Sequence, residues 1–132
     1  MKIKATIEKG NDGYYSVRSD AKIGRAYLGG FGNTVEEARA DFAASIEEAI
    51  DDAKDNGLKY PLSIAVEFTY DLPSFFNYFD IINVSKFADY AGINESKMRQ
   101  YKSGVTCPGE KTTKKILSAI KKIGAEFSMV SL

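Results

Sequence analysis

The stretch Val84–Gly104, VSKFADYAGINESKMRQYKSG, decides the fold of the C-terminal part of this sequence. Its first eight residues have a short helical pattern, Gly92 allows a tight turn, and Asn94 is suited to cap a second helix that ends at Gly104. The apolar residues around that second helix fall on its inner side: Ile93, Met98 and Tyr101. The pattern predicts two short helices that cross closely through a turn.

Long polar side chains are left for the outer side of the second predicted helix, namely Glu95, Ser96, Lys97, Arg99, Gln100 and Lys102. A helix of this kind can enter the major groove of DNA, where the residues of its first two turns lie deepest. Arginine suits guanine and glutamine suits adenine in bidentate hydrogen bonds. We expect base-edge contacts from Glu95, Ser96, Arg99 and Gln100, beside the capping residue Asn94. For Glu95 the alternative is a helix cap.

Lysines around the same segment are candidates for contacts with DNA phosphates. They are Lys86, Lys97, Lys102, Lys111 and Lys114. Loss of such contacts lowers affinity for every DNA sequence and flattens the dependence on salt. For any one of these lysines, the alternative is a solvated surface charge, so the prediction rests on the group.

Helical periodicity begins at Pro73, which suits the first residue of a helix, and continues to the end of the chain. Phe75, Phe76 and Phe79 have helical spacing, which favours a hydrophobic core over a platform for stacked bases. A further amphipathic helix is predicted over Lys111–Ile123. Its apolar side consists of Ile116, Leu117, Ile120 and Ile123. The apolar residues at the end of the chain are expected to pack against a second subunit or, alternatively, against their own subunit. They are Phe127, Met129, Val130 and Leu132.

The first 70 residues have the pattern of three strands, a helix and a fourth strand. Alternation over residues 2–8 predicts a strand, and turn residues at 10–13 lead to a return strand over Tyr14–Ser19. Further strands are predicted over Ala26–Phe31 and Leu62–Tyr70. The glycines at 29, 30 and 32 suggest a need for backbone freedom. We predict an α+β chain of two domains, with residues 1–71 in the β-β-β-α-β part and 72–132 in an all-α part.

A long helix is predicted between the third and fourth strands. Thr34 and Glu37 form a capping box in which each side chain bonds to the backbone of the other residue, and Gly57 ends the helix. Acidic residues gather in its C-terminal half, where they oppose the helix dipole. They are Glu47, Glu48, Asp51, Asp52 and Asp55. Either solvent or a basic partner must accommodate them.

Charge is divided unevenly along the chain, although basic and acidic residues both number 18. Residues 1–82 contain 9 basic and 14 acidic side chains, and residues 83–132 contain 9 basic and 4 acidic ones, so the two parts carry −5 and +5. Such a division is typical of a protein with one end that faces nucleic acid. Uneven solvation of two surfaces is the alternative.

The composition speaks against most enzyme classes. The chain has no histidine, which excludes Ser-His-Asp triads and imidazole zinc sites, and Cys107 is its single cysteine. Asp12, Asp20, Asp41, Asp71 and Asp80 supply carboxylates but form no paired motif. We therefore expect no enzyme activity, no metal site and no cofactor. No apolar run reaches membrane-spanning length, and residues 1–4 open into the first strand, so we expect a cytoplasmic protein.

Two resemblances to known families cover nearly the whole chain. The stretch Ser85–Gly104 with the following helix resembles the Xre or lambda-repressor-like helix-turn-helix class, with residues at matching steps at Ala88, Gly92, Ile93, Ser96, Met98 and Gly104. The first 70 residues resemble the HicB-like antitoxin domain, a partial RNase H-like fold. The matching segments are MKIKATIEKG (1–10), NDGYYSVRSD (11–20) and GGFGNTVEEARADFAASIEEAI (29–50). At residues 19–24 the chain lacks the Asp-Leu-Pro-Gly-Cys segment common in that family.

The resemblances imply an antitoxin-type transcriptional regulator. Its C-terminal part would bind operator DNA, and its N-terminal part would neutralise a small, basic HicA-like RNase toxin. The acidic helix surface at residues 47–55 is complementary in sign to such a toxin, which favours encounter and specificity. The alternative is a stand-alone helix-turn-helix regulator whose N-terminal part serves dimerisation or ligand binding. In both cases we expect a homodimer or a higher even oligomer.

Overall fold

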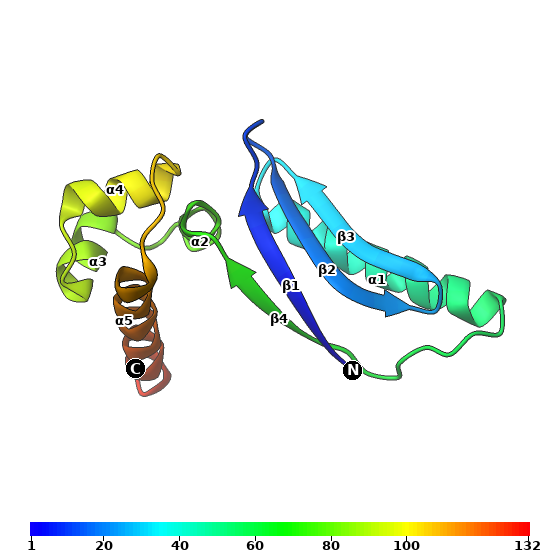
Figure 1. Ribbon diagram of the computed structural model, residues 1–132. Helices are drawn as coiled ribbons and strands as arrows, with labels where there is room; N and C mark the ends of the chain where they lie inside the picture. Colours follow the sequence, from blue (N-terminus) through cyan, green and yellow to red (C-terminus); the bar gives the residue numbers. More distant parts are fainter. The chain divides into compact units, whose positions relative to one another are not determined.

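The computed structural model describes all residues from 1 to 132. The chain divides into an N-terminal unit, Met1–Phe79, and a C-terminal unit, Asp80–Leu132. The first holds a four-stranded sheet and two helices, and the second holds three helices (Figure 1). The α+β class expected from the sequence is confirmed, with strands confined to the N-terminal unit.

The sheet of the N-terminal unit has the strand order β3-β2-β1-β4. Its strands are β1 (Lys2–Lys9), β2 (Tyr15–Ile23), β3 (Ala26–Gly32) and β4 (Ala65–Tyr70). The first three pair antiparallel as a meander, and β4 returns parallel to β1. The predicted order β-β-β-α-β is correct for this unit. The second strand runs further than expected, with an irregular register between Arg18 and Lys22.

The fourth strand is shorter than the predicted range Leu62–Tyr70. Ala65 pairs with Lys2, and the backbone N–H of Ala65 donates to the carbonyl of Met1. Residues 62–64 lie before this point, where β1 offers no further strand to pair with. The hydrophobic alternation at Leu62 and Ile64 therefore continues beyond the ladder, and the side chain of Leu62 is fully open to solvent.

Helix α1 (Val35–Asp55) covers β3 and β2, with β4 to one side (Figure 1). It begins as predicted, because the Thr34 hydroxyl accepts from the backbone N–H of Glu37 at 3.1 Å. The Glu37 carboxylate reaches Asn33 N–H at 2.8 Å, and not Thr34 as expected. Ile3, Ile7, Val17 and Phe42 are among the side chains of the core between the two layers.

Glycine at positions 30 and 32 makes this close packing possible. A Cβ atom on Gly30 would lie 2.5 Å from both the carbonyl oxygen of Ala38 and the backbone nitrogen of Phe42. One on Gly32 would lie 2.6 Å from the backbone nitrogen of Ala38. Neither glycine has a positive φ angle. The expectation that these residues supply backbone freedom is wrong, because what they supply is space for α1.

Helix α2 (Leu72–Tyr78) belongs to the N-terminal unit, so the predicted boundary at 71/72 is too early. Asp71 caps this helix through the N–H of Ser74 and also accepts from the N–H of Lys9 in β1. The Asn77 amide oxygen accepts from the N–H of Val35 at the start of α1, at 2.9 Å. Phe75 and Phe76 are buried, as their spacing predicted. These hydrogen bonds tie α2 to the sheet and to α1.

The C-terminal unit consists of α3 (Val84–Ala91), α4 (Glu95–Ser103) and α5 (Glu110–Ser128). Both short helices have the predicted boundaries, and each ends at a glycine in the left-handed conformation, Gly92 with φ 70° and Gly104 with φ 84°. Helix α5 is longer than the predicted range 111–123. Ile116 is buried, whereas Leu117, expected on the same apolar side, is half exposed.

Candidate nucleic-acid interface

Helices α3 and α4 cross through a turn that the local sequence specifies. Asn83 caps α3 by accepting from Lys86 N–H at 3.0 Å, and Asn94 caps α4 by accepting from Lys97 N–H at 3.1 Å. Gly92 ends α3, and the N–H of Ile93 donates to the carbonyl of Ala88. Because the caps satisfy the first free N–H groups of each helix, the helix starts are fixed by the chain itself.

The inner sides of the three helices enclose a small core. Met98 from α4 is fully buried, and Tyr101 is nearly so. The other buried apolar residues of this unit are Val84, Phe87, Ala88, Ala91, Ile116 and Ala119. Helix α3 packs against both α4 and α5. This core holds α4 with its polar side outward.

The outward side of α4 carries Ser96, Lys97 and Gln100, all exposed and none in an ion pair. Ser96 and Gln100 are four residues apart and share one face. Lys102, in the last turn of α4, is exposed as well.

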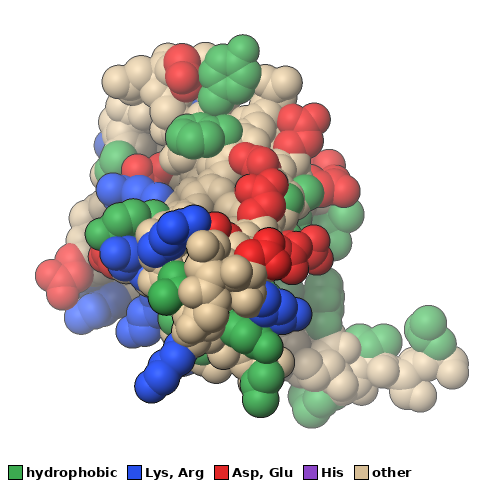
Figure 2. Space-filling model, turned by 90° about the vertical axis from the view of Figure 1, so that its right-hand side faces the viewer, with side chains coloured by type: hydrophobic (Ala, Val, Ile, Leu, Met, Phe, Trp, Pro, Cys, Tyr) green, Lys and Arg blue, Asp and Glu red, His purple; other side chains and the backbone are tan.

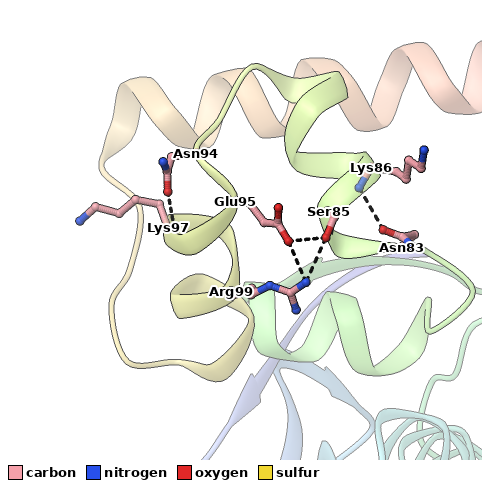
Figure 3. A network of polar contacts seen from close by, with 7 residues as sticks. All are labelled: Asn83, Ser85, Lys86, Asn94, Glu95, Lys97 and Arg99. Carbon is pink, nitrogen blue, oxygen red and sulfur yellow. Dashed lines mark hydrogen bonds and ion pairs between the residues drawn. The ribbon is translucent and has the colours of Figure 1, made fainter.

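Glu95 and Arg99, two of the expected base readers, are held in a network with Ser85 of α3 (Figure 3). One guanidinium nitrogen of Arg99 donates to the Glu95 carboxylate at 2.9 Å and to the Ser85 hydroxyl at 3.0 Å. The same hydroxyl donates to the Glu95 carboxylate. The network joins the start of α3 to the first two turns of α4, so it fixes how these helices cross.

The network also sets the charge state of Glu95. Hydrogen bonds from Ser85 and from Arg99 hold the pKa of the Glu95 carboxyl below its usual value. The carboxylate is therefore ionised at neutral pH and neutralises part of the charge of Arg99. The other two guanidinium nitrogens of Arg99 take part in neither of these bonds, so they are left as donors that the network already orients.

Five lysines were expected at phosphates, and all are exposed. Lys86 lies in the first turn of α3, so it is close to the Ser85 network. Lys114 forms an exposed ion pair with Glu110 at 3.5 Å, one turn earlier on α5. Such a pair contributes little to stability, so it leaves Lys114 available for other anions.

Helices α3 and α5 form a basic groove of about 620 Å³ that the sequence interpretation did not identify. Lys111 and Lys114 line it together with Tyr90, Ala91, Lys115, Ser118, Ala119 and Lys122. The amino group of Lys115 also donates to the carbonyl of Gly92 at 3.3 Å, at the end of α3. A signal was present in the sequence, because residues 111, 115, 118 and 122 repeat at helical spacing.

The acidic residues expected to bind a protein partner lie along the C-terminal half of α1. Figure 2 shows several acidic side chains gathered on the right of that view, with lysine and arginine side chains mainly on its left. Glu47, Glu48, Asp51 and Asp55 are exposed. Asp52 is different, because Arg25 binds its two carboxylate oxygens at 2.8 and 3.0 Å.

The Asp52–Arg25 pair ties the turn between β2 and β3 to α1. The hydrogen bond from Arg25 and the positive charge of Arg25 lower the pKa of the Asp52 carboxyl. Both carboxylate oxygens of Asp52 are therefore already bonded to Arg25. This makes Asp52 a poorer candidate for binding a partner than the other four acidic residues of α1. The acidic side chains of the chain form no group that could hold a metal ion.

Comparison of the chain with protein-family models, with curated proteins and with solved structures finds no match. None of the helices combines the length and apolar content that a bilayer span requires.

Proposed function

We propose that this chain is an antitoxin-type transcriptional regulator, which binds operator DNA through the C-terminal unit as a helix-turn-helix domain. The observation that carries the proposal is the α3–turn–α4 arrangement, in which Met98 is buried and Ser96 and Gln100 point outward. A recognition helix needs this division, with one side anchored in a core and long polar side chains free to reach base edges.

Charge supports the same assignment. The C-terminal unit has 9 basic and 5 acidic residues, and the N-terminal unit has 9 basic and 13 acidic ones, so their net charges are +4 and −4. Phosphate contacts supply most of the affinity of DNA-binding domains and need a basic surface. The positive unit is also the one that presents α4.

In this proposal the N-terminal unit is a HicB-like domain that neutralises a HicA-like RNase toxin. Its four exposed α1 acids, Glu47, Glu48, Asp51 and Asp55, would face the basic toxin. Charge of opposite sign raises the rate of encounter and favours the correct partner. Asp52 would keep α1 and the β2–β3 turn together.

The test of DNA binding uses the promoter upstream of the chain's own gene. We expect Gln100→Ala to weaken binding to that promoter by about 1–3 kcal/mol and to leave binding to random DNA unchanged. Lys97→Ala should instead weaken both and reduce the salt slope by about one. Lys59→Ala, an exposed lysine of the N-terminal unit, is the charge-matched control. Equal binding of promoter and random DNA by the parent chain would contradict the proposal.

The test of toxin binding uses the neighbouring gene product, if it is a small basic protein. We expect the full chain to bind it, and replacement of Glu47, Glu48, Asp51 and Asp55 by the corresponding amides to slow association. The control replaces the exposed Asp20 and Glu36 by amides, which also removes negative charge from the same unit. Promoter binding without any toxin binding would favour the stand-alone regulator instead.

A further inference from the structure

The two edges of the sheet differ in how they are covered. At the β3 edge, side chains of α1 accept from two outward backbone N–H groups. Phe31 N–H donates to the Asp41 carboxylate at 2.9 Å, and Gly29 N–H donates to the Ser45 hydroxyl at 3.3 Å. This edge is therefore closed to a further strand.

The β4 edge carries no such cover. Ala65 and Asp71 donate their N–H groups toward β1, to the carbonyls of Met1 and Ile7. Backbone groups alternate in direction along a strand, so Glu67 and Thr69 also face β1. The N–H and C=O groups of Val66, Phe68 and Tyr70 consequently face away from β1, toward the free edge.

The side chains of these three residues form an incompletely covered apolar surface. Helix α1 packs mainly on β3 and β2, which leaves Val66, Phe68 and Tyr70 half buried. The guanidinium group of Arg39 lies 4.2 Å from the ring centre of Phe68 and donates to the Tyr70 hydroxyl at 2.8 Å. Arg39 and Phe42 thus cover part of this surface from the α1 side, and the rings of Tyr78 and Phe79 pack against Tyr70 at its end. No side chain is hydrogen-bonded to the outward backbone groups of Val66, Phe68 and Tyr70.

We propose that this edge binds a second copy of the chain, with the two β4 strands antiparallel around Phe68. In this register Phe68 lies opposite Phe68 of the second copy, and Val66 lies opposite Tyr70. Both are positions at which backbone groups face the free edge, so each residue exchanges its N–H and C=O with its counterpart. The two sheets become one continuous sheet.

The side chains select this register and favour a second copy as the occupant. Val66 opposite Tyr70 is a pair of a β-branched and an aromatic residue, which stabilises neighbouring strands. Glu67, whose carboxylate pairs with Lys2 of β1 at 2.8 Å, lies opposite Thr69, whereas a register centred on Glu67 would place two such ion pairs face to face. With Phe68 opposite Phe68, the strand Ala65–Tyr70 is therefore complementary to itself in backbone direction, apolar face and charge.

The experiment tests the register directly by disulfide formation in the full chain. In a Cys107→Ser background, Glu67→Cys and Thr69→Cys chains are prepared separately and then mixed under oxidising conditions. Opposite residues at such positions have Cα atoms about 4.5 Å apart, within disulfide range. Like residues are diagonal neighbours, about 7–8 Å apart. We expect a linked dimer in the mixture and at least tenfold less in either chain alone.

Hydrogen exchange of the same backbone groups provides an independent measurement on the unmodified chain. We expect the amides of Val66, Phe68 and Tyr70 to exchange more slowly as protein concentration rises. A linked dimer formed by Glu67→Cys alone would overturn the register. Fast exchange at every concentration together with no linked dimer would overturn the pairing. Protection that arises only with the neighbouring basic protein would assign the edge to that partner, and would likewise overturn it. Promoter binding does not enter any of these readouts.

Discussion

The two units of this chain are stabilised in different ways. In the N-terminal unit, a sheet and a helix of 21 residues enclose one continuous core, and side chains of α1 close one sheet edge. In the C-terminal unit, three helices share a few buried side chains, and much of α5 remains exposed. The first unit therefore depends on how closely its layers approach, and the second on single side chains and helix ends.

The largest expected effect is in the smaller core. Met98→Ala removes a fully buried side chain of α4, and truncations of this kind cost about 2–5 kcal/mol. Since the C-terminal unit has few other buried residues, we expect this unit to unfold while the sheet remains folded. Two-dimensional NMR spectra would show loss of dispersed signals from residues 80–132 only.

The control for this prediction is Lys97→Ala, at the adjacent exposed position, which should change stability by less than about 0.5 kcal/mol. If Met98→Ala unfolded both units together, the units would be one cooperative structure, and the idea that each is stabilised separately would be wrong.

The next effect concerns the close contact of β3 with α1. Gly30→Ala places a methyl group 2.5 Å from two backbone atoms of α1, so the helix must move away from the sheet. We expect a loss of about 3 kcal/mol in the free energy of unfolding, the upper part of the usual range for overpacking. Urea unfolding of the N-terminal unit, followed by circular dichroism, measures it.

Gly29→Ala is the matched control, because its nearest contact would be the Val17 carbonyl oxygen at an ordinary 3.5 Å. We expect little change there, or a small gain from a less flexible unfolded chain. Equal losses in unfolding free energy for Gly29→Ala and Gly30→Ala would mean that the intrinsic backbone preference of glycine causes both losses. The close approach of α1 to β3 would then not be the cause.

These glycines show what the sequence could and could not predict. Alternation, capping residues and turn glycines are local signals, and they correctly placed α3, α4 and the order of strands. Glycine is needed at positions 30 and 32 because α1, which begins later in the chain, passes close to β3. Local sequence reasoning could not see this contact and attributed the two glycines to backbone freedom. The domain boundary failed for the same reason, since the bonds of Asn77 and Asp71 to distant residues hold α2 in the N-terminal unit.

The candidate DNA-binding residues divide in a similar way. Periodicity alone identified Ser96, Lys97 and Gln100 as outward-facing. It did not identify the bonds of Glu95 and Arg99 to Ser85, because these depend on how two helices cross. The basic groove between α3 and α5 depends on a similar crossing, although the spacing of its lysines was visible.

A smaller effect is expected at the exposed end of α5. Ile116, Ile120, Ile123 and Phe127 of α5 recur at steps of four and three, a spacing typical of helices that pair. The stripe is buried at Ile116 and reaches 68% exposure at Phe127. We expect a second copy to cover it, so deletion of residues 126–132 should lower the molar mass measured by light scattering. An unchanged mass would mean that the C-terminal unit is complete by itself.

The smallest effect compares two ion pairs, Glu95–Arg99 in the C-terminal unit and Asp52–Arg25 in the N-terminal unit. The pKa of Glu95 is lowered first by Ser85 and then by Arg99, and that of Asp52 is lowered by Arg25. A lowered folded-state pKa contributes stability that is present above the usual carboxyl pKa and is lost as pH falls through the lowered value. Because the hydrogen bond from Ser85 is the larger cause, Ser85→Ala should raise the pKa of Glu95 toward its usual value. The stability that this group contributes should then be lost at a higher pH.

Carboxyl NMR titration of the Ser85→Ala chain measures this shift, and Asp52 in the same sample serves as an internal reference that should not move. Ser96→Ala, next to Glu95 but outward-facing, is the control variant. If the pKa of Glu95 stayed low in Ser85→Ala, Arg99 alone would account for the lowered pKa. The Glu95 pair would then resemble the Asp52 pair, in which arginine is the cause. A rise confined to Glu95 would show that the C-terminal unit uses a hydroxyl from a second helix where the N-terminal unit uses a bidentate arginine.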